Sequence, residues 1–325
     1  MWQLIAIALN TFREAIRNRL FAALLLMTVG MLVVVAAFSS ASLHEEVRLV
    51  KDMGLFLTST LSVLIAIFVG VNLVYKEIDR RTLYTVAPKP IYRWQFLLGK
   101  YVGLGLTLAI QVLFLGAALA AVYGTVTGAE GTALTFVGIL TGWLVADFLA
   151  QAIGARPFEP GASGDSTLLM DRVRRLLALA AGVGLILYTG LVLPLEMLQA
   201  LFLVYVEVMV VTAVALVFSS FSSPFLSGFL TFGVFVLGRF SDRLAGLDLS
   251  EKGQPLDPVL ERVQTLVHGI AQVMPDLTLF NVTPYVVYGH PVTWAFVLQS
   301  ALYGATYASL ALLLAALMFS RRDFM

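Results

Sequence analysis

The sequence predicts an all-α protein, a polytopic bundle of helices that cross a membrane. Hydrophobic residues make up 59% of the 325-residue chain, above the roughly 45–50% of a typical soluble domain. Charged residues make up 13%, about half the usual share. A soluble globule needs more polar surface than this chain can supply, so the composition excludes a soluble or disordered protein.

The length of the apolar runs is the third observation behind this fold class. A spanning helix needs about 20 mostly apolar residues. Five runs meet this length and two further runs are weaker but long enough: 20–40, 54–75, 101–123, 197–218 and 292–319, then 133–151 and 176–195. An eighth run, 225–240, is short and spans only if the preceding turn contributes or the bilayer thins locally.

The distribution of basic residues orients these eight predicted spans. With the N-terminus in the cytoplasm, fifteen Lys and Arg residues lie inside and six, among them Arg239, lie outside. This asymmetry follows the positive-inside rule. We therefore expect both termini in the cytoplasm.

Residues 1–19 are predicted to form an amphipathic helix at the membrane surface. Leu4, Ala8, Phe12 and Ile16 recur at four-residue spacing, with charged residues on the other side. The rest of the chain, 20–325, is predicted to be a single transmembrane domain. The alternative is that the N-terminal helix only extends the first span into water.

The longest extramembrane stretch is the outer segment 241–291. Asp257 and Pro258 are a plausible N-cap and first residue of a helix. An apolar stripe follows, which predicts an amphipathic helix over 258–274 that rests on the outer leaflet or caps the bundle.

The cytoplasmic segment between the second and third spans is dense in charge and is broken by Pro88 and Pro90. Such a helix–break–helix pattern predicts an elbow that docks against another protein. Glu77, Arg81 and Tyr84 share one face of the predicted helix, and the prolines stiffen the turn. The alternative is an ordinary solvated loop.

Catalytic and nucleotide-binding motifs are missing from the sequence. The chain has no Cys, and its three His residues are scattered. Gly99-Lys100 is the only Gly-Lys pair, but position 94 is Trp and position 101 is Tyr, so the phosphate-binding loop pattern fails. We expect no enzyme activity in this chain and no cofactor or metal. A net charge of +1 does not suggest nucleic acid.

One acidic residue, Glu207, lies in the middle of an apolar run. A carboxylate at that depth costs a few kcal/mol and is by default a functional-site hypothesis. The alternative is a protonated or hydrogen-bonded Glu that packs against Thr212 or Tyr205.

The segment from Tyr75 to Lys100 resembles a pattern of type-two ABC-transporter permeases. It carries Glu77, then Arg81-Thr82-Leu83, Pro88 and a final Leu98-Gly99-Lys100. The opening TFREAIRNRLF is similar to the interfacial elbow helix of this family. PDLTLFNV is similar to an outer segment in the branch that includes the permeases for nitrous-oxide-reductase maturation and gliding motility.

This resemblance implies a membrane subunit in the inner membrane of a bacterium, which pairs with a second copy or a close homologue and binds two separate ATPase subunits. Residues 76–98 would then be the coupling segment. The docking residues implied are Glu77, Arg81, Thr82, Tyr84 and Pro88, and a second cytoplasmic contact would be made by Ser219, Ser220 and Pro224. The family usually has six spans, so 131–195 is expected to be an inserted hairpin. Arg81 also stands where many members have Gly.

The function expected from these observations is that of a permease subunit in an ATP-driven transporter, surrounded by membrane lipid. Two alternatives stay open at this point. One is a mechanotransmitting or scaffold subunit that relays ATPase strokes to a periplasmic partner. The other is an ion-coupled secondary transporter.

Overall fold

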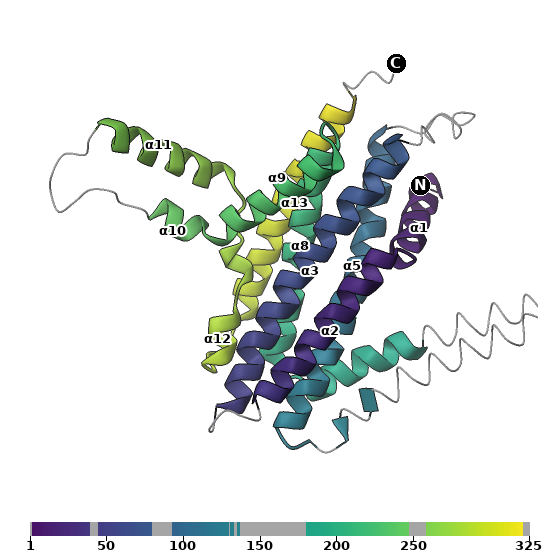
Figure 1. Ribbon diagram of the computed structural model, residues 1–325, viewed down its shortest axis with the longest axis vertical. Helices are drawn as coiled ribbons and strands as arrows, with labels where there is room; N and C mark the ends of the chain where they lie inside the picture. The colour runs from purple at the N-terminus through teal and green to yellow at the C-terminus, as the bar shows by residue number, and fades with distance from the viewer. Residues whose placement is uncertain are drawn as a thin grey trace, which may run out of the picture.

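The computed structural model describes residues 2–39, 45–79, 93–129, 131–132, 135–136, 180–246 and 258–320. Every regular element in these ranges is a helix (Figure 1), which confirms the predicted all-α class. The elements are α1 (Trp2–Ile16), α2 (Arg19–Ser39), α3 (Glu46–Asp79), α5 (Arg93–Val126), α8 (Leu195–Ser219), α9 (Pro224–Arg239), α10 (Ser241–Ala245), α11 (Pro258–Val273), the 3-10 turn η1 (Thr278–Phe280), α12 (Thr283–Val287) and α13 (Trp294–Ser320). A further apolar helix, Ala180–Val192, precedes α8.

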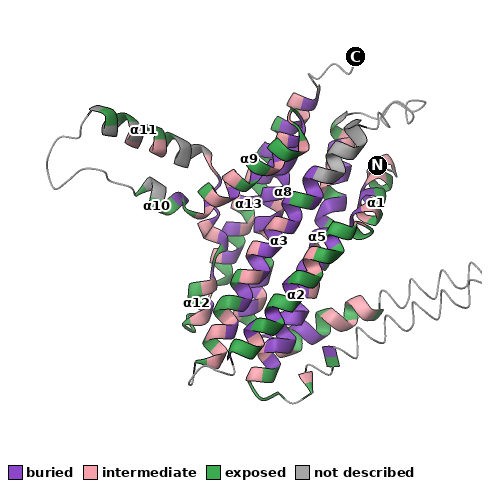
Figure 2. Cartoon of the chain, viewed as in Figure 1, coloured by how far each residue is buried: buried purple, intermediate pink, exposed green. Residues whose placement is uncertain are grey.

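Five of these helices are long and apolar enough to cross a membrane, namely α2, α3, α5, α8 and α13. They correspond to the five full-length apolar runs of the sequence, so the polytopic bundle is confirmed at this level. In the most apolar stretch of α3, α5 and α8, 72% of the residues are buried, against 22% in α2 and 28% in α13. The first three therefore form the centre of the bundle, and α2 and α13 form its periphery (Figure 2).

The outward faces of the two peripheral helices are apolar. On α2 the exposed side chains include Leu26, Val33 and Phe38, and on α13 they include Leu310 and Leu313. A helix that is hydrophobic on all sides is typical of a membrane span, because lipid replaces water on its outer face.

Contacts between the central helices fix their directions. Ser59 on α3 meets Glu207 on α8, and the Cα of Gly70 faces Ala215, so α3 and α8 run parallel. The chain reverses in α5, whose Leu119 faces Gly54 near the start of α3. The ends of α3 and α5 that flank residues 80–92 therefore lie at the same end of the bundle as the end of α8 (Figure 1).

Residues 127–194 leave and re-enter the bundle at the opposite end, where α5 finishes and α8 starts. The Tyr188 hydroxyl donates to the carbonyl of Thr132 at 2.9 Å and joins the two ends of this insertion. The sequence predicts that 155–172, between the weaker runs 133–151 and 176–195, lies in the cytoplasm. This stretch and nearly all of 133–151 lie outside the described residues, and the hairpin 131–195 stays a prediction.

Helix α9 covers only about half the length of α8. A turn over residues 220–223 reverses the chain, and the 16 residues of α9 then rise about 24 Å. The helix ends at Arg239, beside Glu207, which is near the middle of α8. By length, the run 225–240 is therefore not a complete span on its own.

The part of α8 that α9 does not reach is covered by the residues that follow α10 and α11. Residues 275–282 return to the bundle, where Leu277, Phe280 and Val282 are buried. The Leu277 amide donates to the carbonyl of Gly238 at 3.1 Å. The segment 241–291 thus starts and returns beside the middle of α8, and only its later part, with α12, lies at the far end of the bundle (Figure 1).

The predicted helix in the outer segment is confirmed, since α11 begins at Pro258 and ends at Val273. It extends away from the bundle together with α10 (Figure 1), and Val259 and Leu266 on it are exposed. Its position on the outer leaflet stays a prediction.

In the predicted N-terminal helix, residues 2–16 are helical and form α1, whereas its place at the membrane surface stays a prediction. Helix α1 ends at Ile16, and the Asn18 side-chain oxygen accepts a hydrogen bond from the Leu20 amide at 3.0 Å, which caps the start of α2. The small side chains Ala8, Thr11 and Ala15 are buried, whereas Ile16 is exposed. The residues of α1 that pack inward are therefore small, and among them only Ala8 belongs to the apolar stripe seen in the sequence.

Candidate functional site

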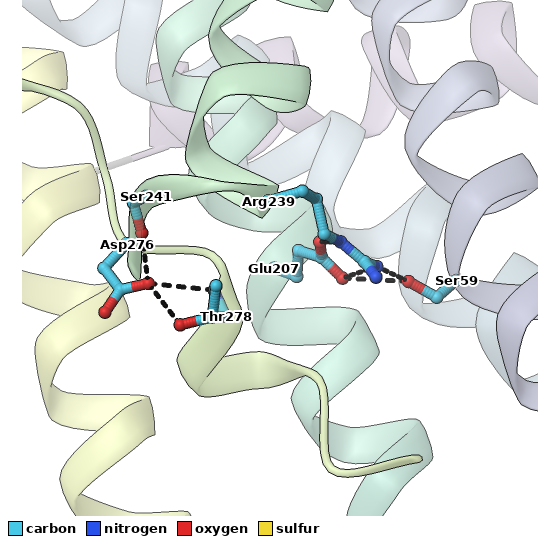
Figure 3. A network of polar contacts seen from close by, with 6 residues as sticks. All are labelled: Ser59, Glu207, Arg239, Ser241, Asp276 and Thr278. Carbon is cyan, nitrogen blue, oxygen red and sulfur yellow. Dashed lines mark hydrogen bonds and ion pairs between the residues drawn. The ribbon is translucent and has the colours of Figure 1, made fainter. Parts of the chain in front are cut away.

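An ion pair lies buried in the middle of the bundle (Figure 3). Glu207 on α8 is 1% exposed. The Arg239 guanidinium at the end of α9 donates through Nε to Glu207 Oε1 at 2.8 Å and through Nη2 to Oε2 at 2.9 Å. This bidentate geometry matches the planar fork of the guanidinium to the carboxylate and is the strongest form of the pair.

A third helix joins the pair through Ser59 of α3. The Ser59 hydroxyl donates to Glu207 Oε2 at 2.9 Å and is also bonded to Arg239 Nη2. The guanidinium carbon lies 5.5 Å from the centroid of the Phe235 ring, one turn earlier on α9. The carboxylate therefore has three donors and the cation has a charge partner and an aromatic face, so both desolvated charges are compensated.

A second polar cluster pins the two ends of the excursion that contains α10 and α11 (Figure 3). Asp276 Oδ1 accepts from the Ser241 hydroxyl at 2.7 Å and from the amide and hydroxyl of Thr278 at 3.0 and 2.6 Å. The Asp276 amide donates to the Tyr303 hydroxyl at 2.8 Å, and the Thr278 hydroxyl donates to Asp242 at 2.9 Å. The chain is thus fixed both where it leaves α9 and where it returns.

The sequence singled out Glu207 but not its partners. Thr212 and Tyr205, the partners considered for it, donate instead to the carbonyls of Val208 and Gly105. Arg239 was counted among the outer charges, and Ser59 was not considered. A signal for Arg239 existed, because it ends an apolar run too short to span.

The predicted docking residues are described only in part. Glu77 lies in the helical backbone of α3, and its side chain is outside the described set. Four others lie outside the described residues altogether: Arg81, Thr82, Tyr84 and Pro88. Their role in docking stays a prediction.

The Gly99-Lys100 end of this segment is described and packs against α1. An added Cβ at Gly99 would lie 2.8 Å from Ile7 Cγ2, and one at Gly103 would clash with the carbonyl oxygen of Ala8. Lys100 is buried, with its Nζ 5.1 Å from the centroid of the Phe96 ring. The two glycines therefore let α1 lie directly on α5, immediately after residues 80–92.

The second predicted contact lies in the turn between α8 and α9. The hydroxyls of Ser219 and Ser220 are buried and donate to the carbonyls of Ala215 and Val217 at 2.7 and 2.6 Å. Pro224 is the first residue of α9. The exposed groups of this turn are aromatic and include Phe221 and Phe225, so a partner that bound here would meet these rings first.

Residues 5–155 match the model of a family described as "ABC-2 family transporter protein". The match covers α1, α2, α3 and α5 and spans less than half of the chain. It supports the resemblance drawn from the sequence, and together with the five long apolar helices it supports a multi-pass membrane protein. The nitrous-oxide-reductase and gliding-motility branch stays a prediction. A search of curated proteins gave no match.

Proposed function

We propose that this chain is the membrane-spanning permease subunit of an ATP-driven ABC transporter. The observation that carries the proposal is the family match over residues 5–155, which includes the interfacial helix and the segment 76–98. A second copy or a close homologue would complete the translocation path. Separate ATPase subunits would hydrolyse ATP.

The arrangement of the helix ends supports a partner at one end of the bundle. Residues 80–92 are flanked there by α3 and α5, and the turn over residues 220–223 lies at that end because α8 runs parallel to α3. The C-terminal end of α13 is there as well (Figure 1). One partner seated on this end would reach both proposed contacts.

The same helices supply the mechanical link that such coupling needs. α3 and α5 are each 34 residues long, about 51 Å at 1.5 Å per residue, and they are unbroken from this end into the buried core. A displacement of residues 80–92 would reach the bundle centre through two rigid helices. ATP would then bias the bundle between two states by binding one of them better.

Charge reversal at Glu77 tests the docking residues. Glu77→Lys is expected to reduce co-purification of the ATPase subunit or to uncouple ATP hydrolysis from transport, because it adds like-charge repulsion at a contact. Glu46→Lys, the same change at the far end of α3, is the matched control and should leave both intact. A fully coupled complex with Glu77→Lys would contradict the docking assignment, since an added inside charge only reinforces the topology.

The two alternative functions predict different results in ATPase and transport assays. A relay subunit would pass strokes to a periplasmic partner, and α10 and α11, which extend from the bundle, are the described elements available for it (Figure 1). No solute would then stimulate ATP turnover. An ion-coupled transporter would move solute along an ion gradient without nucleotide, but Glu207, the mid-span acid in the described part of the chain, is already paired with Arg239. Transport assays with trapped nucleotide, with and without an ion gradient, separate these cases.

A further inference from the structure

The inward row of α5 contains one polar exception. Its central members recur every three or four residues and are at most 1% exposed: Leu104, Leu108, Gln111 and Leu115. This spacing is that of helices packed by regular interdigitation of apolar side chains. Gln111, which is fully buried, interrupts an otherwise leucine row.

The facing row of α3 is interrupted at the same depth. Thr58 and Ser62 are both fully buried, between apolar neighbours on the same row. Because α3 and α5 are antiparallel and Gly54 faces Leu119 while Gly70 faces Leu104, the residues midway between these contacts come opposite one another. Ser62 therefore lies at the level of Gln111, and Thr58 lies one helical turn away, at the level of Leu115. We call Thr58, Ser62 and Gln111 the polar layer.

Four polar atoms of this layer have no hydrogen-bond partner among the described residues, namely Thr58 Oγ1, Ser62 Oγ, Gln111 Nε2 and Gln111 Oε1. Other buried hydroxyls on the long helices donate to the carbonyl four residues earlier, as Thr28, Thr107, Thr212 and Ser219 do. The hydroxyls of Thr58 and Ser62 do not make this hydrogen bond to the carbonyl four residues earlier. Leaving buried polar atoms unpaired is costly, and native proteins almost always pair them.

We propose that the polar layer is a binding site for ordered water between α3 and α5. The two hydroxyls and the amide together offer both donors and acceptors, and a buried water typically makes about three hydrogen bonds. A bound cation fits the layer poorly, because it would need a charge partner in a medium of low dielectric constant. Glu207, the buried acid that Ser59 contacts on the neighbouring turn of α3, is already neutralised by Arg239.

The water site lies where it could affect the movement of α3 relative to α5. α3 and α5 flank residues 80–92, so the layer lies between the two helices that would carry a displacement of that segment. Hydrogen bonds through water can exchange partners, whereas interlocked leucines must separate. The water site itself does not depend on the proposed transport function.

Stability measurements on the full chain in lipid nanodiscs test the proposal. The variants are Thr58→Val, Ser62→Ala and Gln111→Met, which remove polar atoms with little change in shape, and the double variant Ser62→Ala/Gln111→Met. If water bridges the layer, each single change lowers Tm by about 2–4 °C, because the remaining groups lose a partner. The double variant then falls little further than the worse single variant.

The matched control is Thr107→Val, which removes a buried hydroxyl of α5 that already bonds to Gly103. It should show no coupling with Ser62→Ala. An unchanged or raised Tm in the single variants, with additive effects in the double variant, would mean that the layer is dry and would overturn the proposal. A density map that resolves ordered water gives an answer independent of folding: water between Ser62 and Gln111 supports the site, and Ser62 bonded to its own helix with nothing at Gln111 refutes it.

Discussion

The substitution Arg239→Met tests the buried ion pair. It removes two N–H donors and the opposite charge from Glu207, which is 1% exposed, and leaves the carboxylate with only the Ser59 hydroxyl. Breaking a buried pair by removing one partner typically costs about 3–5 kcal/mol, because the other charge stays buried without compensation. At about 1.4 kcal/mol per tenfold, this cost is a factor of roughly one hundred to a few thousand in the folding equilibrium.

Thermal unfolding in nanodiscs, followed by Trp fluorescence, measures this cost. For a large domain about 2–4 °C corresponds to 1 kcal/mol, so Tm should fall by at least about 6 °C. The double variant Glu207→Leu/Arg239→Met removes both charges and should recover most of the loss, since apolar replacement of a buried pair is often neutral. Arg243→Met, an exposed arginine near the pair, is the control and should change stability by less than about 0.5 kcal/mol.

Two results would refute this reasoning. The first is a loss of less than about 1 kcal/mol in Arg239→Met, which is the size expected of a solvated surface pair. The second is a double variant no more stable than the single one, which would mean that the arginine acts through its own packing and not through the carboxylate.

Three further predictions concern the site, the N-terminal helix and the topology. Glu207→Gln should lower coupled ATPase activity, and it should destabilise the fold less than Arg239→Met does, because the Arg239 side chain that loses its opposite charge is 15% exposed and the amide oxygen can still accept hydrogen bonds; unchanged activity would make Glu207 purely structural. Gly103→Ala should destabilise the protein by about 1–3 kcal/mol, because its Cβ meets the backbone of α1, whereas Gly30→Ala, which faces open space, should be neutral in the same unfolding assay. A single Cys at Ser163 should resist impermeant thiol reagents in intact cells, and ready labelling would contradict the eight-span topology.

The sequence predicted the fold class and the long helices because these depend on local composition. A run of about 20 apolar residues determines a span with no knowledge of its neighbours. The start of α11 at Pro258 was likewise a local signal, since proline is suited to the first turn of a helix. The break at Asn18 between α1 and α2 is also local, whereas the contact of Ala8 and Thr11 with Gly103 of α5 joins distant segments and could not be predicted from the stripe of 1–19.

The candidate site could be predicted only in part because its contacts are distant in the sequence. Glu207 stood out alone, but Arg239 lies 32 positions later and Ser59 lies 148 positions earlier. The positive-inside count assigned Arg239 to the outside, since that rule treats every basic residue near a span end as solvated. The polar layer would have been easier to predict from the sequence, because Gln111 interrupts a row of leucines that recur at helical spacing.

The buried pair explains how a helix as apolar as α9 keeps a fixed depth. Its buried face carries mostly small side chains (Ser227, Thr231 and Gly238, beside Phe235) and would pack at several heights with similar energy, because helices in lipid gain little from one register over another. Arg239 removes this freedom, since its guanidinium is compensated only where Glu207 and Ser59 meet it. A single buried polar group fixes register in the same way in coiled coils. The depth at which the chain leaves α9 for α10 and α11 is therefore set by three polar side chains. The hydrogen bonds of Asp276 hold the returning segment at the same level.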